Sequence, residues 1–143
     1  RNPVGSKHAP HSDDGCVILV KLWWMHADDQ EFVRLDTTRD DLWRPTDASG
    51  VEVMKLHKFR DATAALYRLA AGAALPARDL LGGEEFFVLD GSCRDDQGSY
   101  GEASWVRTPI GEAPALHSDG GCRLYVKRGH LRDPPPGPLA TAT

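Results

Sequence analysis

The chain has 143 residues, of which 41% are hydrophobic and 27% charged, and its net charge is −4 at neutral pH. This length fits one domain of roughly 100–200 residues, and the hydrophobic content favours a folded globular protein over a disordered one. The charges are interspersed, so no basic stripe is available to neutralise phosphates, and no apolar run approaches the roughly 18 residues of a membrane helix. We therefore expect no nucleic-acid partner, no membrane partner and a cytoplasmic location.

Short β-strands are predicted along most of the chain. Gly, Pro and Asp clusters separate β-rich segments from one another, a pattern typical of an antiparallel sandwich or barrel. Helical signal is confined to residues 37–43, where one turn should end before Pro45. The predicted strands are residues 16–25, 31–36, 51–59, 63–70, 85–90, 104–108 and 122–127. The expected fold class is all-β.

One segment of the sequence occurs twice. RNPVGSKHAPHSDDGCVILVK begins at residue 1, RTPIGEAPALHSDGGCRLYVK begins at residue 107, and 11 of their 21 positions are identical. Such a long spacing predicts two copies of a whole small domain, since solenoid repeats recur every 20–50 residues or so. We expect residues 1–26 to be the last strands of a first, truncated repeat and residues 27–131 a complete second domain. Residues 132–143 are predicted to be a proline-rich disordered tail, and the chain to be part of a longer protein.

The three cysteines do not predict a disulfide framework. Their number is odd, and the chain is long enough to form a hydrophobic core. Cys16 and Cys122 hold the same place in the repeat, each at the start of an apolar run. The simpler interpretation is a small buried side chain at a strand start. A redox pair or thiol sensor is the alternative.

Residues 72–91, GAALPARDLLGGEEFFVLDG, resemble the first cupin motif. In that motif Gly, five residues, His-x-His, three or four residues, Glu, six residues and Gly follow one another. The glycine frame and Glu84 match here, but Arg78 and Leu80 stand in place of the two histidines. Glu84 and Glu85 should point to opposite faces of a strand, so they do not form an acid/base dyad.

The second cupin motif, Pro-x-Gly-x-x-His, occurs once in each copy of the repeat. PVGSKH keeps the histidine as His8, whereas PIGEAP has Pro114 in its place. Together with GGEEFFVLDG, VILVKLWWM, VRLDTT and LYVKRGHL, these phrases make residues 1–131 similar to the ChrR-like cupins, a family that includes the cupin domain of zinc-binding anti-sigma factors. The similarity is greatest to two-cupin members of the family. It implies a double-stranded β-helix, the cupin or jelly-roll barrel; anti-sigma activity in this family also needs a separate helical, zinc-binding domain.

The resemblance also implies one divalent metal held by two His and a Glu of the first motif and the His of the second. Those positions are Arg78, Leu80, Glu84 and Pro114 in the second copy, so only Glu84 is of a ligand type. A lone carboxylate does not hold a transition metal tightly, because such sites use about three protein ligands. We predict no cofactor in this copy and a buried pair between Arg78 and Glu84. The alternative is that Arg78 extends to solvent and Glu84 stays hydrated.

His8 is the metal-ligand candidate of the first copy. Its partners would lie before residue 1, so Zn, Fe or Ni is expected only in a longer protein. The other histidines match no ligand spacing, although a relocated site that uses them is an alternative. The residues do not identify a small-molecule ligand.

Two functions fit these observations. The first is a degenerate second cupin that acts as a non-catalytic structural, sensory or regulatory module. The second is part of a metal-dependent, dioxygenase-type cupin enzyme whose metal site lies in the upstream copy. A homodimer formed through sheet edges is the candidate assembly. The sequence alone leaves open whether the protein is an enzyme, because fold does not fix function.

Overall fold

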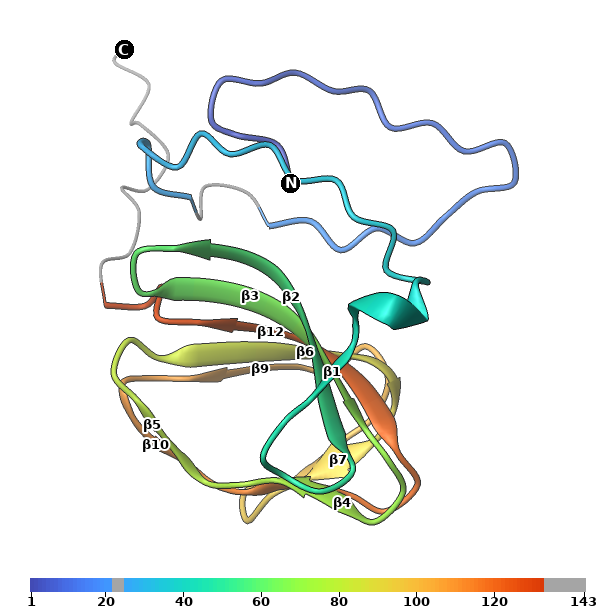
Figure 1. Ribbon diagram of the computed structural model, residues 1–143, viewed down its shortest axis with the longest axis vertical. Coiled ribbons are helices and arrows are strands. Elements are labelled where there is room, and N and C mark those ends of the chain that lie inside the picture. The colour runs from blue at the N-terminus through green and yellow to red at the C-terminus, as the bar shows by residue number, and fades with distance from the viewer. Residues whose placement is uncertain (22–24, 133–143) are drawn as a thin grey trace. The chain divides into compact units, whose positions relative to one another are not determined.

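The computed structural model describes residues 1–21 and 25–132 (Figure 1). The chain divides into two compact units, one containing Arg1–Arg34 and the other consisting of Leu35–Asp133. Within the described residues, no helix is long and apolar enough to cross a membrane. Apart from Arg132, the predicted disordered tail lies outside the described residues.

The second unit is built from strands, with one 3-10 turn, η1 (Asp40–Leu42). Its strands are β1 (Arg44–Pro45), β2 (Val51–Phe59), β3 (Ala62–Leu69), β4 (Ala73–Leu75), β5 (Arg78–Leu80), β6 (Glu84–Gly91), β7 (Cys93–Arg94), β8 (Ser99–Tyr100), β9 (Trp105–Thr108), β10 (Gly111–Ala113), β11 (Leu116–Ser118) and β12 (Cys122–Arg128). The all-β fold class predicted from the sequence is confirmed.

The strands form three antiparallel sheets. The largest has the order β1-β2-β3-β12-β6-β9, a second has the order β4-β11-β7-β8, and β10 pairs with β5 in a two-stranded ribbon. Figure 1 shows β5, β10, β4 and β7 on the opposite side of this unit from β3, β12, β6 and β9. The unit is therefore a two-layered antiparallel barrel.

The core lies between these layers. Along β12 the buried Cys122, Leu124 and Val126 alternate with more exposed neighbours, as expected for a strand with one face on a core. Core residues come from both layers; they are Val51, Leu69, Ala73, Leu75, Phe86, Val88, Cys93, Leu116, Cys122, Leu124 and Val126.

Five predicted strands in this unit are confirmed to within one or two residues; they are β2, β3, β6, β9 and β12. The turn predicted in residues 37–43 is also confirmed as η1. Seven strands of only two or three residues each were not predicted from the sequence; they are β1, β4, β5, β7, β8, β10 and β11. Segments this short carry little periodicity, so their pairing depends on contacts distant in sequence.

The strand predicted at residues 31–36 is wrong. Backbone groups of this segment bond to Arg1 instead: Val33 donates to the Arg1 carbonyl at 3.0 Å, and the Arg1 amino group donates to the Val33 carbonyl at 2.5 Å. The Arg1 side chain adds an ion pair with Asp29 at 2.6 Å. One residue at the start of the chain thus holds the segment without forming a strand ladder.

The strand predicted at residues 16–25 is not found in its described part. Residues 16–21 and Met25 form no strand, and residues 22–24 lie outside the described residues. Cys16 is exposed, so its predicted burial is wrong, whereas Cys122 is buried as predicted. The assignment of residues 1–26 to a first cupin repeat stays a prediction.

Candidate functional site

Glu84 is the centre of the candidate site. It opens β6 with only 1% of its surface exposed, opposite Arg128 of β12 in the strand register. Arg78 of β5 donates from Nε to Glu84 Oε2 at 3.0 Å and from Nη2 to Oε1, and Arg128 donates from Nε to Oε2. The carboxylate is thus neutralised by two guanidinium groups. The predicted Arg78–Glu84 pair is confirmed.

The remaining end of Arg78 is held by backbone. Its Nη1 donates to the carbonyls of Pro76 and Pro114, each at 3.3 Å. Pro114 lies there because β10 pairs with β5, with Ala113 opposite Arg78. Leu80, two residues further along β5, is buried. Three of the four positions that match the cupin ligands, Arg78, Glu84 and Pro114, therefore meet directly.

Arg128 was not predicted as part of this site. Its Nη1 donates to the Tyr67 hydroxyl at 3.0 Å, and its guanidinium carbon lies 5.1 Å from the centre of the Tyr67 ring. Its Nη2 is buried and finds no acceptor among the described residues. A signal was present in the alternation of β12, because Arg128 follows Leu124 and Val126 at even spacing on the core face. The predicted strand ended one residue too early to include it.

The two arginines determine the charge of this site. Burial raises the pKa of Glu84, but the hydrogen bonds and positive charges of Arg78 and Arg128 outweigh it and hold that pKa below its usual value. Both carboxylate oxygens already accept guanidinium hydrogen bonds. If a divalent cation bound Glu84, the carboxylate would lose those hydrogen bonds and the cation would lie beside two positive charges. No group of three His, Cys, Asp or Glu suited to a metal occurs among the described residues. These residues do not fit a cupin metal.

Glu85 has a separate set of partners on the other face of β6. It accepts hydrogen bonds from His130 Nε2 and from Trp105 Nε1, the latter at 2.9 Å, and both Glu85 and His130 are buried. The prediction that Glu84 and Glu85 point to opposite faces agrees with these partners. The contacts with His130 and Trp105 were not predicted from the sequence. They depend on how the start of β9 and the residues after β12 lie beside β6.

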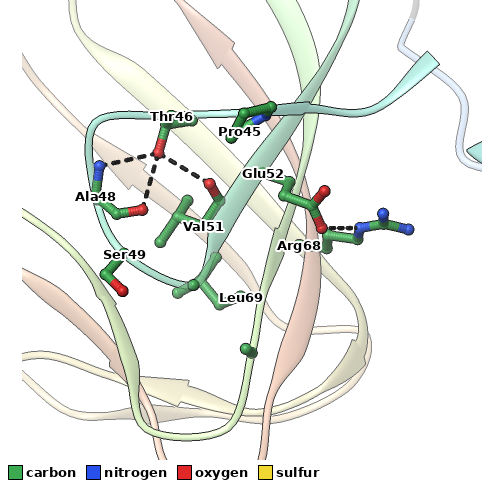
Figure 2. Close-up of a pocket in the computed structure, with 10 residues that line it drawn as sticks. Pro45, Thr46, Ala48, Ser49, Val51, Glu52, Arg68 and Leu69 are labelled. Carbon is green, nitrogen blue, oxygen red and sulfur yellow. Dashed lines mark hydrogen bonds and ion pairs between the residues drawn. The ribbon is translucent and has the colours of Figure 1, made fainter. Parts of the chain in front are cut away.

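Two shallow hollows adjoin the loop between β1 and β2. One, of about 440 Å³, is lined by Thr46, Glu52 and Arg68 among others (Figure 2). Its polar groups bond to one another: Thr46 Oγ1 donates to the Val51 carbonyl at 3.0 Å, and Arg68 Nε donates to Glu52 at 2.5 Å. The neighbouring hollow, of about 650 Å³, is lined mainly by Ala, Gly and Ser.

His8, the first-copy candidate, is exposed in the first unit. Its role as a metal ligand stays a prediction.

The domain has the fold of solved cupins at low sequence identity. A chain of the complex of Rhodobacter sphaeroides SigE with the anti-sigma ChrR is 23% identical, with a TM-score of 0.53 over 60% of this chain and 47% of that chain. An acetylacetone dioxygenase from Acinetobacter johnsonii is 15% identical, with a TM-score of 0.60 over 80% of this chain and 79% of that chain. A putative acetylacetone dioxygenase from Methylibium petroleiphilum PM1 is 14% identical, with a TM-score of 0.62 over 73% and 81%.

No curated protein sequence matches the chain. This chain spans about half the length of the matched chain in the SigE–ChrR complex. The ChrR cupin-like domain family matches residues 31–132, which include every strand described above. The barrel fold and this match agree with the resemblance seen in the sequence. The chain belongs to the ChrR cupin-like domain family.

Proposed function

We propose that this cupin domain is a non-catalytic structural, sensory or regulatory module that works without a metal. The observation that carries the proposal is the buried Glu84 carboxylate, which matches a cupin metal ligand and is held between Arg78 and Arg128. An ion pair of this kind satisfies a buried carboxylate internally. It leaves no ligand free to activate oxygen or water.

A protein partner suits such a module better than a substrate. One structural relative is a chain of a complex between SigE and an anti-sigma protein. The first hollow carries polar groups that are paired with one another, and the second is lined mainly by small side chains. We also expect the protein to be cytoplasmic and to form homodimers through sheet edges.

The second candidate function is an oxygen-dependent enzyme. It is favoured by His8 in the motif PVGSKH and by the fold likeness to an acetylacetone dioxygenase. In that case Zn, Fe or Ni would be held by an upstream copy that includes His8, and the present barrel would support it.

Metal content tests the proposed function directly. After loading with Zn, Fe or Ni and dialysis, the unmodified chain should retain no stoichiometric metal. A variant with Arg78→His, Leu80→His and Pro114→His should retain about one ion per chain, because Glu84 would regain three imidazole partners. Adding Glu84→Gln to that variant is the matched control and should weaken retention.

Two results would contradict the proposal. Tight stoichiometric metal in the unmodified chain would show a site elsewhere. A triple variant that folds, as judged by its circular dichroism, but retains no metal even when Arg128→Gln is added would show that the cupin ligand positions are misplaced.

A further inference from the structure

Cys93 and Cys122 meet in the core of the barrel. Cys93 begins β7 of the four-stranded sheet, and Cys122 begins β12 of the six-stranded sheet. They are 3% and 4% exposed and belong to one core cluster, and each thiol shifts the pKa of the other. Two buried cysteines from opposite layers therefore lie in the same part of the core.

Glycines bring the two cysteines together. The segments Asp90-Gly91-Ser92-Cys93 and Asp119-Gly120-Gly121-Cys122 share the pattern Asp-Gly-small-Cys. Gly91 lies opposite Cys122 in the register and has a φ of +71°, a left-handed conformation that favours glycine. A Cβ on Gly91 would lie 2.2 Å from the Gly121 carbonyl oxygen and 2.9 Å from the Cys122 Cα. Only a glycine at position 91 permits this approach. It brings Cys93, two residues after Gly91, close to the start of β12.

Ser118 completes the cluster. This buried residue of β11 donates from Oγ to the Ser92 carbonyl at 2.6 Å, which ties β11 to the residue before Cys93. The neighbouring Cys93 thiol lowers the pKa of Cys122 to about 7 despite its burial, whereas the Cys122 thiol and burial raise the pKa of Cys93. The charges of Asp90 and Asp95 oppose ionisation of Cys122 and Cys93 respectively. One sulfur is thus disposed to be the nucleophile, and the other keeps its proton beside it.

We propose that Cys93 and Cys122 form a dithiol site that a hydroperoxide oxidises to a disulfide between the two layers of the barrel. The Cys122 thiolate attacks one peroxide oxygen, the O–O bond breaks, and the departing alkoxide takes a proton to leave as alcohol. Cys122 is then a sulfenic acid. The Cys93 sulfur attacks it, the S–S bond forms, and the S–O bond breaks to release water. Overall, two thiols and one hydroperoxide give one disulfide, one alcohol and one water.

The surrounding structure suits reversible access. β7 and β8 are two residues each, and such short pairings open locally more readily than long ladders. The Arg94 side chain of β7 adds an exposed ion pair with Asp119 at 3.1 Å, which contributes little stability. A disulfide would add a covalent link between residues 93 and 122 to these weak contacts. This chemistry goes beyond the proposed function and does not depend on whether the domain binds a metal.

The test uses the full chain with Cys16→Ser, which removes the exposed thiol. After tert-butyl hydroperoxide treatment, both thiols should be lost together, with a mass decrease of two hydrogen atoms and a peptide linking Cys93 to Cys122. Dithiothreitol should restore both thiols. The oxidised chain should melt at least about 5 °C higher than the reduced one, because the link constrains the unfolded chain.

Cys93→Ser and Cys122→Ser, each in the Cys16→Ser background, are matched controls. The first should stop at a sulfenic acid on Cys122, and the second should leave Cys93 reduced. The proposal is overturned if both thiols stay free at peroxide levels that oxidise Cys16 of the unmodified chain. It is also overturned if oxidation gives links between chains, or a sulfinic acid on Cys122 with Cys93 free.

Discussion

At the residue scale, the carboxylate of Glu84 matters most, because it is a buried charge bound by two cationic side chains. Its two cationic partners are not equivalent. Arg78 uses all three guanidinium nitrogens, on Glu84 and on two backbone carbonyls, whereas Arg128 shares its donors between Glu84 and Tyr67. Glu84 therefore keeps a positive partner if either arginine is lost. If the carboxylate charge is lost, two guanidinium groups face each other.

This asymmetry predicts the order of two substitutions. Arg78→Ala should lower the free energy of unfolding by about 1–2 kcal/mol, since Arg128 still neutralises Glu84. Glu84→Gln should cost about 3 kcal/mol or more, because it leaves two adjacent cations at a buried position. Urea unfolding monitored by tryptophan fluorescence gives both values.

Asp90→Asn is the matched control for Glu84→Gln. Asp90 also pairs with an arginine, Arg123, but both side chains are largely exposed, so this change should cost less than about 1 kcal/mol. If Arg78→Ala proves as costly as Glu84→Gln, Arg128 does not neutralise the carboxylate in solution.

At the scale of elements, the sequence predicts the long strands and misses the short ones. β2, β3, β6 and β12 carry seven to nine residues of β-rich sequence, and each pairs along most of its length. β10 and β11 carry three residues each and exist because β5 and β4 lie opposite them. Their position is set by tertiary pairing, which no local pattern encodes.

The residues of the candidate site also fall into those that the sequence predicts and those that only tertiary pairing places. The spacing of the cupin motif was enough to predict that Arg78 and Glu84 meet, because motif positions fix strand and face. Arg128 and Tyr67 join the site only through the registers of β12 with β6 and β3. The proximity of Cys93 and Cys122 likewise depends on the close approach of the backbone at Gly91 to Gly121 and Cys122. Residues supplied by one motif were predictable, and residues supplied by a neighbouring strand were not.

The junction of β6 with β12 gives a prediction at this scale. Gly91→Ala should destabilise the domain by about 3 kcal/mol or more, because its Cβ would clash with backbone atoms of Gly121 and the residue would keep a positive φ. Gly101→Ala is the matched control; a Cβ there meets nothing within 4 Å and φ is not positive, so its effect should be small. Thermal melting monitored by circular dichroism compares the two. Equal melting temperatures would show that β6 and β12 separate at this point in solution.

At the scale of the whole molecule, the first unit presents an apolar run to solvent. Val17, Ile18, Leu19 and Val20 are all exposed, with Ile18 at 55%. Four consecutive exposed apolar residues without a strand ladder are a preferred site of association between chains. Self-association through this run would be an alternative to the homodimer through sheet edges expected from the sequence.

Ile18→Lys should therefore weaken self-association by at least tenfold in dissociation constant, because it would bring a charge into the interface. Ala9→Lys is the control, since Ala9 is also exposed in the first unit and the change adds the same charge outside the run. Sedimentation equilibrium over a range of protein concentrations measures both variants against the unmodified chain. If the two variants associate alike, the run is not the interface, and the sheet edges of the second unit become the next surface to substitute.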